Sequence, residues 1–305
     1  MKNQSSLSEF LLLEFSAIRE LQILHFFSFL VLYLAIVSGN LLIISAVVFD
    51  HHLHTPMYFF LMNLAMQNIG SVSVIIPKSI INSLMNIRHI SYSGCVAQVL
   101  LFIFVVTSDV AFLTVMACDR YVAICNPLHY EVIMSRRTCD RMAARAWIST
   151  FLYAVLHTCG TFAIPFCSNV IDQFFCEVPQ LLKLACSDLY LYENGIVAFG
   201  AMIGFGCFTL IMVSYAKIFS AVRKIPTVQG RKKAFSTCLP HLIVLFLFIF
   251  TAWPPYLKPS PNMPSYINLA ITMLYSVVPP LINPVIYSMR NKEMKNALSK
   301  LLGLK

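Results

Sequence analysis

The side chains best able to do chemistry are two carboxylates and an arginine in one long apolar segment. Asp109 is the only charged residue in segment 91–118, and Asp119 and Arg120 follow directly. A helix turns about 100° per residue, so Phe102, Asp109 and Arg120 would lie within about 20° of one face. A carboxylate inside a membrane is costly and by default functional. The alternative is an Asp109 side chain that neighbouring hydroxyls and amides satisfy.

The composition indicates a membrane protein. Of the 305 residues, 58% are hydrophobic and 11% are charged, and the mean hydropathy is +0.75. A soluble domain carries about a quarter charged residues, which argues against a soluble two-domain enzyme. Disordered chains are poor in apolar residues, so disorder is excluded as well. The net charge of +9 suggests nucleic acid at first sight, but in a membrane chain it marks the cytoplasmic face, and we expect no nucleic-acid partner.

Seven stretches are long and apolar enough to form transmembrane helices, since about 20 apolar residues cross a bilayer. They cover approximately residues 23–48, 57–80, 95–122, 142–164, 195–221, 235–257 and 267–288. We therefore predict an all-α membrane protein, a seven-transmembrane helix bundle over residues 23–288 with a short C-terminal interfacial helix.

The segments outside this domain are predicted from their polarity and periodicity. Residues 1–22 form an extracellular N-terminus, and residues 289–305 form a cytoplasmic amphipathic helix and tail. The second assignment follows from an apolar face at helical spacing, made of Met294, Ala297, Leu298, Leu301 and Leu302. A frayed tail is the alternative.

The placement of basic residues predicts the orientation. With the N-terminus outside, 16 of the 22 Lys and Arg residues lie on the cytoplasmic side, as the positive-inside rule requires. The sequon Asn3-Gln4-Ser5 agrees with this orientation and makes Asn3 a candidate glycosylation site, although such a triplet also arises by chance. We expect a multi-pass plasma-membrane protein with the lipid bilayer as a partner and the C-terminus in the cytoplasm.

Four of the ten cysteines fall on the outer side, where conditions are oxidising and two disulfides can form. They are Cys95, Cys167, Cys176 and Cys186. Four cysteines allow three pairings, and spacing alone does not choose among them. Segment 165–194 contains three of the four and is too long for a tight turn, so it could form a lid over a cavity between helices.

Several motifs stand at the ends of the predicted helices. The third ends with Asp119-Arg120-Tyr121, and the seventh ends with Asn283-Pro284-Val285-Ile286-Tyr287. Together with Gly39-Asn40 of the first helix, they resemble the motifs of rhodopsin-like G-protein-coupled receptors. Longer stretches resemble the odorant receptors, tetrapod class II type: residues 53–61, 116–125, Ser214-Tyr215, 233–238 with His241, and 280–291. The resemblance covers residues 8–300, nearly the whole chain.

The resemblance implies an odorant receptor that binds small hydrophobic volatile ligands within the bundle. It would activate a heterotrimeric stimulatory-type G protein and raise cyclic AMP. The matching ligand positions are mostly apolar, as suits such a ligand: Phe102, Ile103, Val106, Thr107, Phe199, Ile203, Ile249, Trp253, Tyr256, Met273 and Leu274. The matching coupling positions are Asp119, Arg120, Tyr121, Tyr215, His241, Asn283, Pro284 and Tyr287. Asp119 and Arg120 would form a local pair in the inactive state. For the disulfides, we predict Cys95–Cys176 and Cys167–Cys186.

The chain departs from the family pattern in the middle of the membrane. There we expect a polar site of Asn40, Asn68 and Asp109. Asn68 stands where relatives usually have Asp, Asp109 where they usually have Glu, and Cys118 where they usually have Tyr. The site therefore keeps one carboxylate instead of two, and we expect sodium to affect this protein weakly.

Other function classes fit less well. A non-olfactory small-molecule receptor is the first alternative, and a channel or transporter is the second, although the chain shows none of the repeats common in transporters. The cluster His51-His52-x-His54 could suggest a metal, but no mid-membrane His/Asp or Ser/His constellation accompanies it. We expect no enzymatic activity, no cofactor and no metal site.

Overall fold

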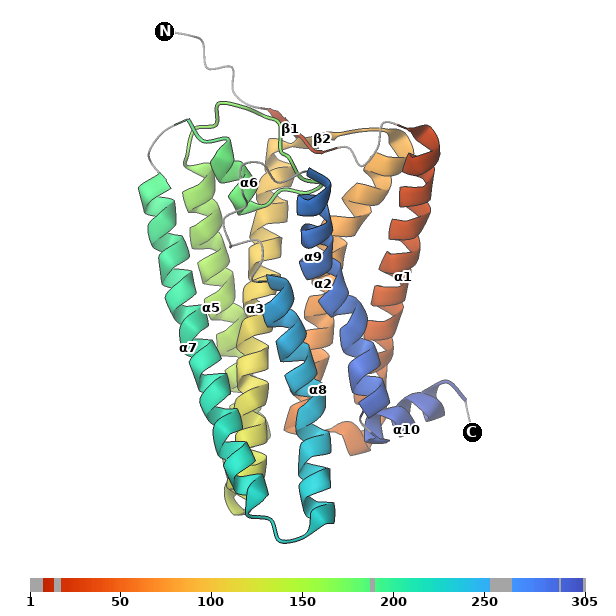
Figure 1. Ribbon diagram of the computed structural model, residues 1–305, viewed down its shortest axis with the longest axis vertical. Coiled ribbons are helices and arrows are strands. Elements are labelled where there is room, and N and C mark those ends of the chain that lie inside the picture. The colour runs from red at the N-terminus through yellow and green to blue at the C-terminus, as the bar shows by residue number, and fades with distance from the viewer. Residues whose placement is uncertain (1–7, 14–17, 187–189, 253–264, 291, 304–305) are drawn as a thin grey trace.

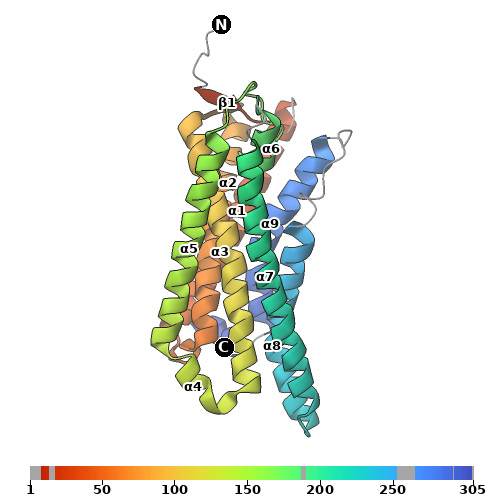
Figure 2. The same cartoon turned by 90° about the vertical axis from the view of Figure 1, so that its left-hand side faces the viewer.

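A computed structural model describes residues 8–13, 18–186, 190–252, 265–290 and 292–303. Within these residues, seven long helices run side by side as a bundle (Figures 1 and 2). They are α1 (Arg19–Phe49), α2 (Pro56–Met85), α3 (Tyr92–Cys125), α5 (Arg136–Phe162), α7 (Tyr190–Arg223), α8 (Val228–Ala252) and α9 (Ser265–Arg290). The predicted architecture is confirmed.

Short elements close the two ends of the bundle. The strands β1 (Glu9–Leu11) and β2 (His89–Ser91) pair antiparallel and share one end with α6 (Val178–Lys183); we name this the strand end. The opposite end carries α10 (Lys292–Leu301) and is named the α10 end. It also holds η1 (His51–Leu53), η2 (Pro127–His129) and α4 (Tyr130–Ile133).

Most helices extend beyond the spans predicted from hydropathy. The reason is that hydropathy marks only the apolar part of a helix, whereas backbone hydrogen bonding continues into its polar ends. Thus α1 begins at Arg19 rather than near residue 23, and α8 begins at Val228 rather than near residue 235. Helix α5 stops earlier, at Phe162 rather than residue 164, and the end predicted for α8 near residue 257 lies outside the described residues.

The helices of the bundle differ in how apolar they are. Among the described residues, five helical segments are long and apolar enough to cross a membrane: Arg19–Phe49, Pro56–Met85, Tyr92–Cys125, Gly195–Lys224 and Ala270–Tyr287. Helix α5 falls outside this group because hydroxyls and His157 interrupt its apolar residues. The described part of α8 begins with a basic turn. Their membership in the bundle comes from packing against the other helices.

The α10 end holds the largest apolar core. Helices α1, α2, α3, α5, α7, α8 and α9 all contribute buried side chains to it. Helix α10 closes it with Met294 and Ala297, whereas Leu302 stays 53% exposed. Tyr58 donates a hydrogen bond of 2.8 Å to Glu293, which ties α2 to the start of α10. One part of the apolar face predicted for residues 289–305 therefore packs on the bundle, and another part faces away from it.

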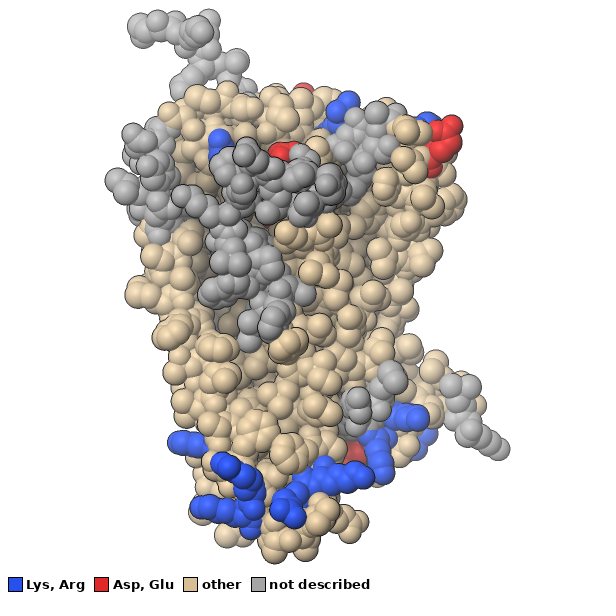
Figure 3. All heavy atoms as spheres, viewed as in Figure 1, with Lys and Arg blue, Asp and Glu red and all other residues tan. Residues whose placement is uncertain are grey.

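Charge is unevenly distributed between the two ends. On the face shown in Figure 3, the Lys and Arg side chains gather at the α10 end, and the middle of the bundle is almost free of charge. At the same end, the Asp50 carboxylate lies 2.9 Å from His52 Nδ1 and 3.3 Å from Lys300 Nζ. The described residues contain no group of three His, Cys, Asp or Glu side chains that could hold a metal ion.

Candidate functional site

Helix α3 places the Asp119–Arg120 pair at the α10 end of the bundle. Arg120 Nε donates to Asp119 Oδ2 at 2.9 Å, and Arg120 Nη2 contacts the same oxygen. The Asp119 side chain is fully buried, and that of Arg120 is 13% exposed. Tyr130 of α4 donates to the other carboxylate oxygen at 2.8 Å. The carboxylate is therefore held by one cation and one hydroxyl, as a buried charge requires.

Tyr215 and His241 form the next contact of this end. The Tyr215 hydroxyl lies 2.6 Å from His241 Nδ1, and His241 Nε2 lies 3.0 Å from the carbonyl oxygen of Leu113. Because a carbonyl only accepts, Nε2 carries the proton, and in the neutral ring Nδ1 accepts from the tyrosine. Tyr215 of α7 is thus bonded to α8, and through it to α3. Tyr121 lies apart from this contact, with Lys217 Nζ 5.4 Å from its ring centre.

A chain of three amides joins α1, α2 and α9 in the bundle interior. Asn283 donates to Asn68 at 3.3 Å, and Asn68 donates to Asn40 at 3.0 Å. Asn40 donates in turn to the carbonyl oxygen of Pro280 at 3.1 Å. That carbonyl lacks its usual helical partner because Pro284, four residues later, has no N–H. The proline of the Asn-Pro motif thus creates the acceptor that Asn40 fills.

Three buried oxygens of the bundle have no hydrogen-bond partner among the described residues. They are Asp109 Oδ1, Asn283 Oδ1 and the Tyr287 hydroxyl. Asp109 also makes no ion pair with a described residue. An unpaired buried polar atom costs about 1–3 kcal/mol, so these three positions are suited to water or to a rearrangement of the helices. Asn40 and Asn68 are joined by the hydrogen bond described above, whereas no hydrogen bond or ion pair among the described residues joins Asp109 to either of them.

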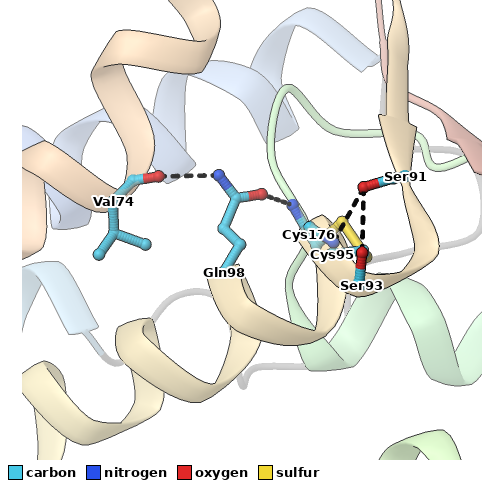
Figure 4. The surroundings of a disulfide bond; sticks show 7 residues. Val74, Ser91, Ser93, Cys95, Gln98 and Cys176 are labelled. Atoms are coloured by element: carbon cyan, nitrogen blue, oxygen red, sulfur yellow. Dashed lines mark hydrogen bonds between the residues drawn. A yellow bond between two sulfur atoms is a disulfide. The ribbon is translucent and has the colours of Figure 1, made fainter.

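Two disulfides staple the strand end, and their pairing is the predicted one. Cys95 bonds to Cys176 and Cys167 bonds to Cys186. Figure 4 shows the first disulfide with Gln98, which lies one turn further along α3. Gln98 accepts a hydrogen bond from the Cys176 N–H at 2.8 Å and donates to the Val74 carbonyl at 2.9 Å. The disulfide loop is therefore held against both α3 and α2.

An aromatic cluster joins this loop to α2, α3 and α9 inside the bundle. It consists of Ile75, Phe174 and Phe175, all buried, with Phe102 and Met273 packed against it. The rings of Phe102 and Phe175 meet edge to face with centres 5.2 Å apart. The structure thus brings together two of the predicted ligand positions, one on α3 and one on α9.

The other predicted ligand positions are more dispersed. Ile103, Val106 and Thr107 are half-buried on α3, and the Thr107 hydroxyl donates to the Ile103 carbonyl of its own helix at 2.7 Å. Phe199 and Ile203 of α7 are each 49% exposed, and Leu274 of α9 is 44% exposed. Four residues of the predicted sites lie outside the described residues: Asn3, Trp253 and Tyr256 entirely, and Ile249 in its side chain.

Comparison with known proteins decides the family. A family model described as "Olfactory receptor" matches residues 29–305. The chain belongs to the olfactory receptor family. It is 46% identical over 303 residues to human olfactory receptor 14A16, covering 99% of this chain and 98% of the relative. It is 49% identical over 302 residues to human olfactory receptor 14I1, covering 99% and 97%.

A solved structure supports the rhodopsin-like fold. The crystal structure of squid rhodopsin matches with a TM-score of 0.76, covering 94% of this chain and 82% of rhodopsin at 16% identity. The rhodopsin match shows the fold alone. Membership of the olfactory receptor family makes this chain a multi-pass membrane protein and a G-protein-coupled receptor. Receptors of this family are not enzymes, which confirms the expectation that the chain has no enzymatic activity.

The sequence did not single out several residues that complete the receptor's sites. Tyr130 donates a hydrogen bond to Asp119. Hydrogen bonds of Gln98, Gln173 and Glu177 hold residues 173–177 of the disulfide loop against α3 and α9. One signal could have found Phe175. It directly precedes Cys176, whose partner Cys95 lies seven residues, or about two turns, before Phe102. A disulfide at that spacing brings the preceding residue close to the predicted ligand position.

Proposed function

We propose that this receptor binds small hydrophobic volatile ligands and, on binding, activates a stimulatory-type heterotrimeric G protein that raises cyclic AMP. The observation that carries the proposal is the single helix α3, which contacts both candidate sites. Phe102 belongs to the aromatic cluster near one end, and the Asp119–Arg120 pair belongs to the other. A displacement of α3 by a ligand would therefore reach the ion pair directly.

The ligand class follows from the chemistry of the cluster. Its members are apolar, and the Thr107 hydroxyl is already bonded within its helix. Apolar pockets with few polar anchors suit uncharged hydrophobic molecules. The proposed ligand site comprises Phe102, Ile103, Val106, Thr107 and Met273, joined by Phe199, Ile203 and Leu274 as α7 and α9 close around the ligand. By the family resemblance, Ile249, Trp253 and Tyr256 belong to it as well.

The coupling step is proposed for the α10 end. Asp119 and Tyr130 hold Arg120 in the inactive state, and G-protein docking draws Arg120 away towards Tyr215. Tyr215 would exchange its hydrogen bond with His241 for one with Arg120. Tyr287, whose hydroxyl is unpaired within the described residues, would join Tyr215 and Arg120. Asn283 and Pro284 would transmit the movement of α9. The basic side chains at this end (Figure 3) favour a cytoplasmic location for it, with the strand end and Asn3 outside.

The test is a panel of volatile compounds applied to cells that carry the receptor and a cyclic AMP reporter. At least one hydrophobic compound should give a concentration-dependent signal. Arg120→Ala should abolish the signal for every active compound at unchanged surface expression, and Phe102→Ala should change potencies compound by compound. A ligand-gated current without G protein would contradict the proposal, as would responses that neither variant alters.

A further inference from the structure

The segment Gln173–Glu177 of the disulfide loop enters the bundle and is held there by more than its disulfide. Gln98 is 5% exposed and uses both ends of its amide. Its oxygen accepts from the Cys176 N–H, and its nitrogen donates to the Val74 carbonyl (Figure 4). That carbonyl has a second lone pair available beside its helical bond. One side chain therefore sets the distance between the loop, α3 and α2.

Two further contacts hold the same segment against α9. Gln173 donates from Nε2 to the Thr272 hydroxyl at 2.5 Å, and the Tyr275 hydroxyl donates to the Glu177 carboxylate. Gln173 is fully buried and Glu177 is 7% exposed. The segment is thus tied to α2, α3 and α9 along its whole length, and buried hydrogen bonds of this kind are costly to leave unmade.

The result of this anchoring is the position of two aromatic rings. Phe174 and Phe175 point from the segment into the bundle and are 2% and 0% exposed. Phe175 meets Phe102 edge to face, and Phe174 meets Phe175 in the same way with ring centres 5.0 Å apart. Both rings belong to the cluster with Ile75 against which Met273 packs. Phe102 and Met273 belong to the proposed ligand site, so the two rings form its boundary on the strand side.

We propose that Phe175 is a specificity-determining residue that limits ligand length, and that Gln98 is the positioning residue that holds it. The inference rests on the proposed function, because it concerns the ligand site named there. The disulfide fixes the side chain of Cys176, but the backbone on either side of it could still rotate if the disulfide were its only attachment. The amide of Gln98 removes that freedom and holds Phe175 against Phe102.

The first experiment measures the position of the segment without any ligand. Hydrogen–deuterium exchange of the purified full-length receptor is followed in peptides that contain residues 173–177. Gln98→Met keeps the length of the side chain but has no group to pair with the Cys176 N–H. We expect exchange in the segment to rise on the order of tenfold. Ser93→Ala is the matched control, since Ser93 lies in the first turn of α3 and its side-chain hydrogen bond to a described residue joins it to Ser91, at 3.4 Å.

The second experiment measures ligand selection with straight-chain aliphatic alcohols of increasing length on the cyclic AMP reporter. Phe175→Ala removes the ring that limits the site, so the preferred length should increase. Each further buried methylene is worth about fourfold in potency. Gln98→Met should flatten the dependence on length because the ring is no longer held at one position. Ser93→Ala should keep the wild-type order of potencies.

The two experiments separate the ways in which the inference could be wrong. Unchanged exchange in Gln98→Met would overturn the positioning role, whatever the ligand results. Raised exchange with an unchanged order of potencies in both Gln98→Met and Phe175→Ala would overturn the role in specificity. If Gln98→Met does not reach the surface, Phe175→Ala and Phe175→Leu still test the length limit. A wild-type receptor that answers no alcohol and no compound of the volatile panel would contradict the proposed function, while exchange would still decide the position of the segment.

Discussion

The two ends of α3 are stabilised in different ways. At the α10 end, the chain relies on charge and hydrogen bonds: Asp119 with Arg120 and Tyr130, and Tyr215 with His241. At the strand end it relies on a covalent bond between Cys95 and Cys176 and on interlocked aromatic rings. Both ends are well buried, so the difference lies in the type of bond rather than in the degree of burial.

The difference indicates which end can change partners. An ion pair can be exchanged for another at small net cost when a new partner arrives, because the charge remains paired. A disulfide and a packed aromatic cluster have no such alternative. We therefore expect the α10 end to switch and the strand end to keep its geometry.

Breaking the covalent link should produce the largest effect. Replacing both Cys95 and Cys176 by Ser should lower the free energy of unfolding by about 2–5 kcal/mol, because the loop then loses its fixed position over α3. The measurement is surface expression together with the melting temperature of the solubilised receptor. The matched control is the Cys167/Cys186 pair, which closes a separation of only 19 residues against 81. An equal or larger loss for the control would contradict the ranking.

Weakening the ion pair should instead change signalling. Asp119→Asn keeps an acceptor for the Tyr130 hydroxyl but removes the charge that holds Arg120. A charge-assisted bond is worth about 1.5–3 kcal/mol, so the population of the active state should rise roughly tenfold or more. Ligand-free cyclic AMP, normalised to surface expression, measures this rise. Tyr130→Phe should give a smaller rise in the same direction. Lower basal signalling in Asp119→Asn would mean that the pair supports the active state.

Much of this contrast could be predicted from the sequence. The seven helices, the pairing of the cysteines and the Asp119–Arg120 contact were all expected. The helices and the Asp119–Arg120 contact rest on local signals, whereas the pairing of Cys95 with Cys176 was expected from the family resemblance, since spacing alone does not choose it. Apolar length marks a membrane helix, and adjacent residues at a helix end are close whatever the rest of the chain does.

The contacts that escaped prediction depend on pairs far apart in the sequence. Gln98 and Cys176 are separated by 78 residues, and Tyr275 and Glu177 by 98. A glutamine in an apolar helix has many possible partners, and only the packing of the loop selects one. The same reason applies to Phe175, which hydrophobicity alone cannot distinguish from a lipid-facing residue such as Phe205, 72% exposed on α7.

The chain of amides lies between the two ends of the bundle. Breaking it tests whether the middle of the bundle depends on hydrogen bonds for its stability. Asn40→Ala leaves Asn68 Nδ2 and the Pro280 carbonyl without their partner. The melting temperature should fall by the equivalent of roughly 1–2 kcal/mol, the cost of unpaired buried polar groups. Asn63→Ala, which breaks a 3.0 Å bond from Trp147 at the edge of the core, is the matched control for losing an amide. If Asn40→Ala is neutral, the chain of amides carries no stability.

A smaller effect is expected from pH, which should change the stability of the strand end through Glu177. Burial raises the pKa of Glu177 above the ordinary value of 4.5, opposed in part by the hydrogen bond from Tyr275. The folded state therefore favours the protonated carboxyl group. Its stabilising contribution is complete below pH 4.5 and is lost as the pH rises through the raised pKa. The melting temperature of the wild type should fall over that range relative to Glu177→Gln, and parallel profiles for the two would refute the assignment.

The smallest effect is expected from sodium. Asp109 is the one carboxylate of the mid-membrane site, and Asn68 offers an amide where a second charge would attract a cation more strongly. Replacing sodium by potassium at constant ionic strength should shift the melting temperature by no more than about 1 °C. Asp109→Asn keeps the size of the side chain and removes a carboxyl group whose Oδ1 has no partner among the described residues, so we expect no loss of stability. A strong sodium dependence of basal signalling that disappears in Asp109→Asn would instead show that one carboxylate suffices, and that the middle of α3 is a third region with its own type of bond.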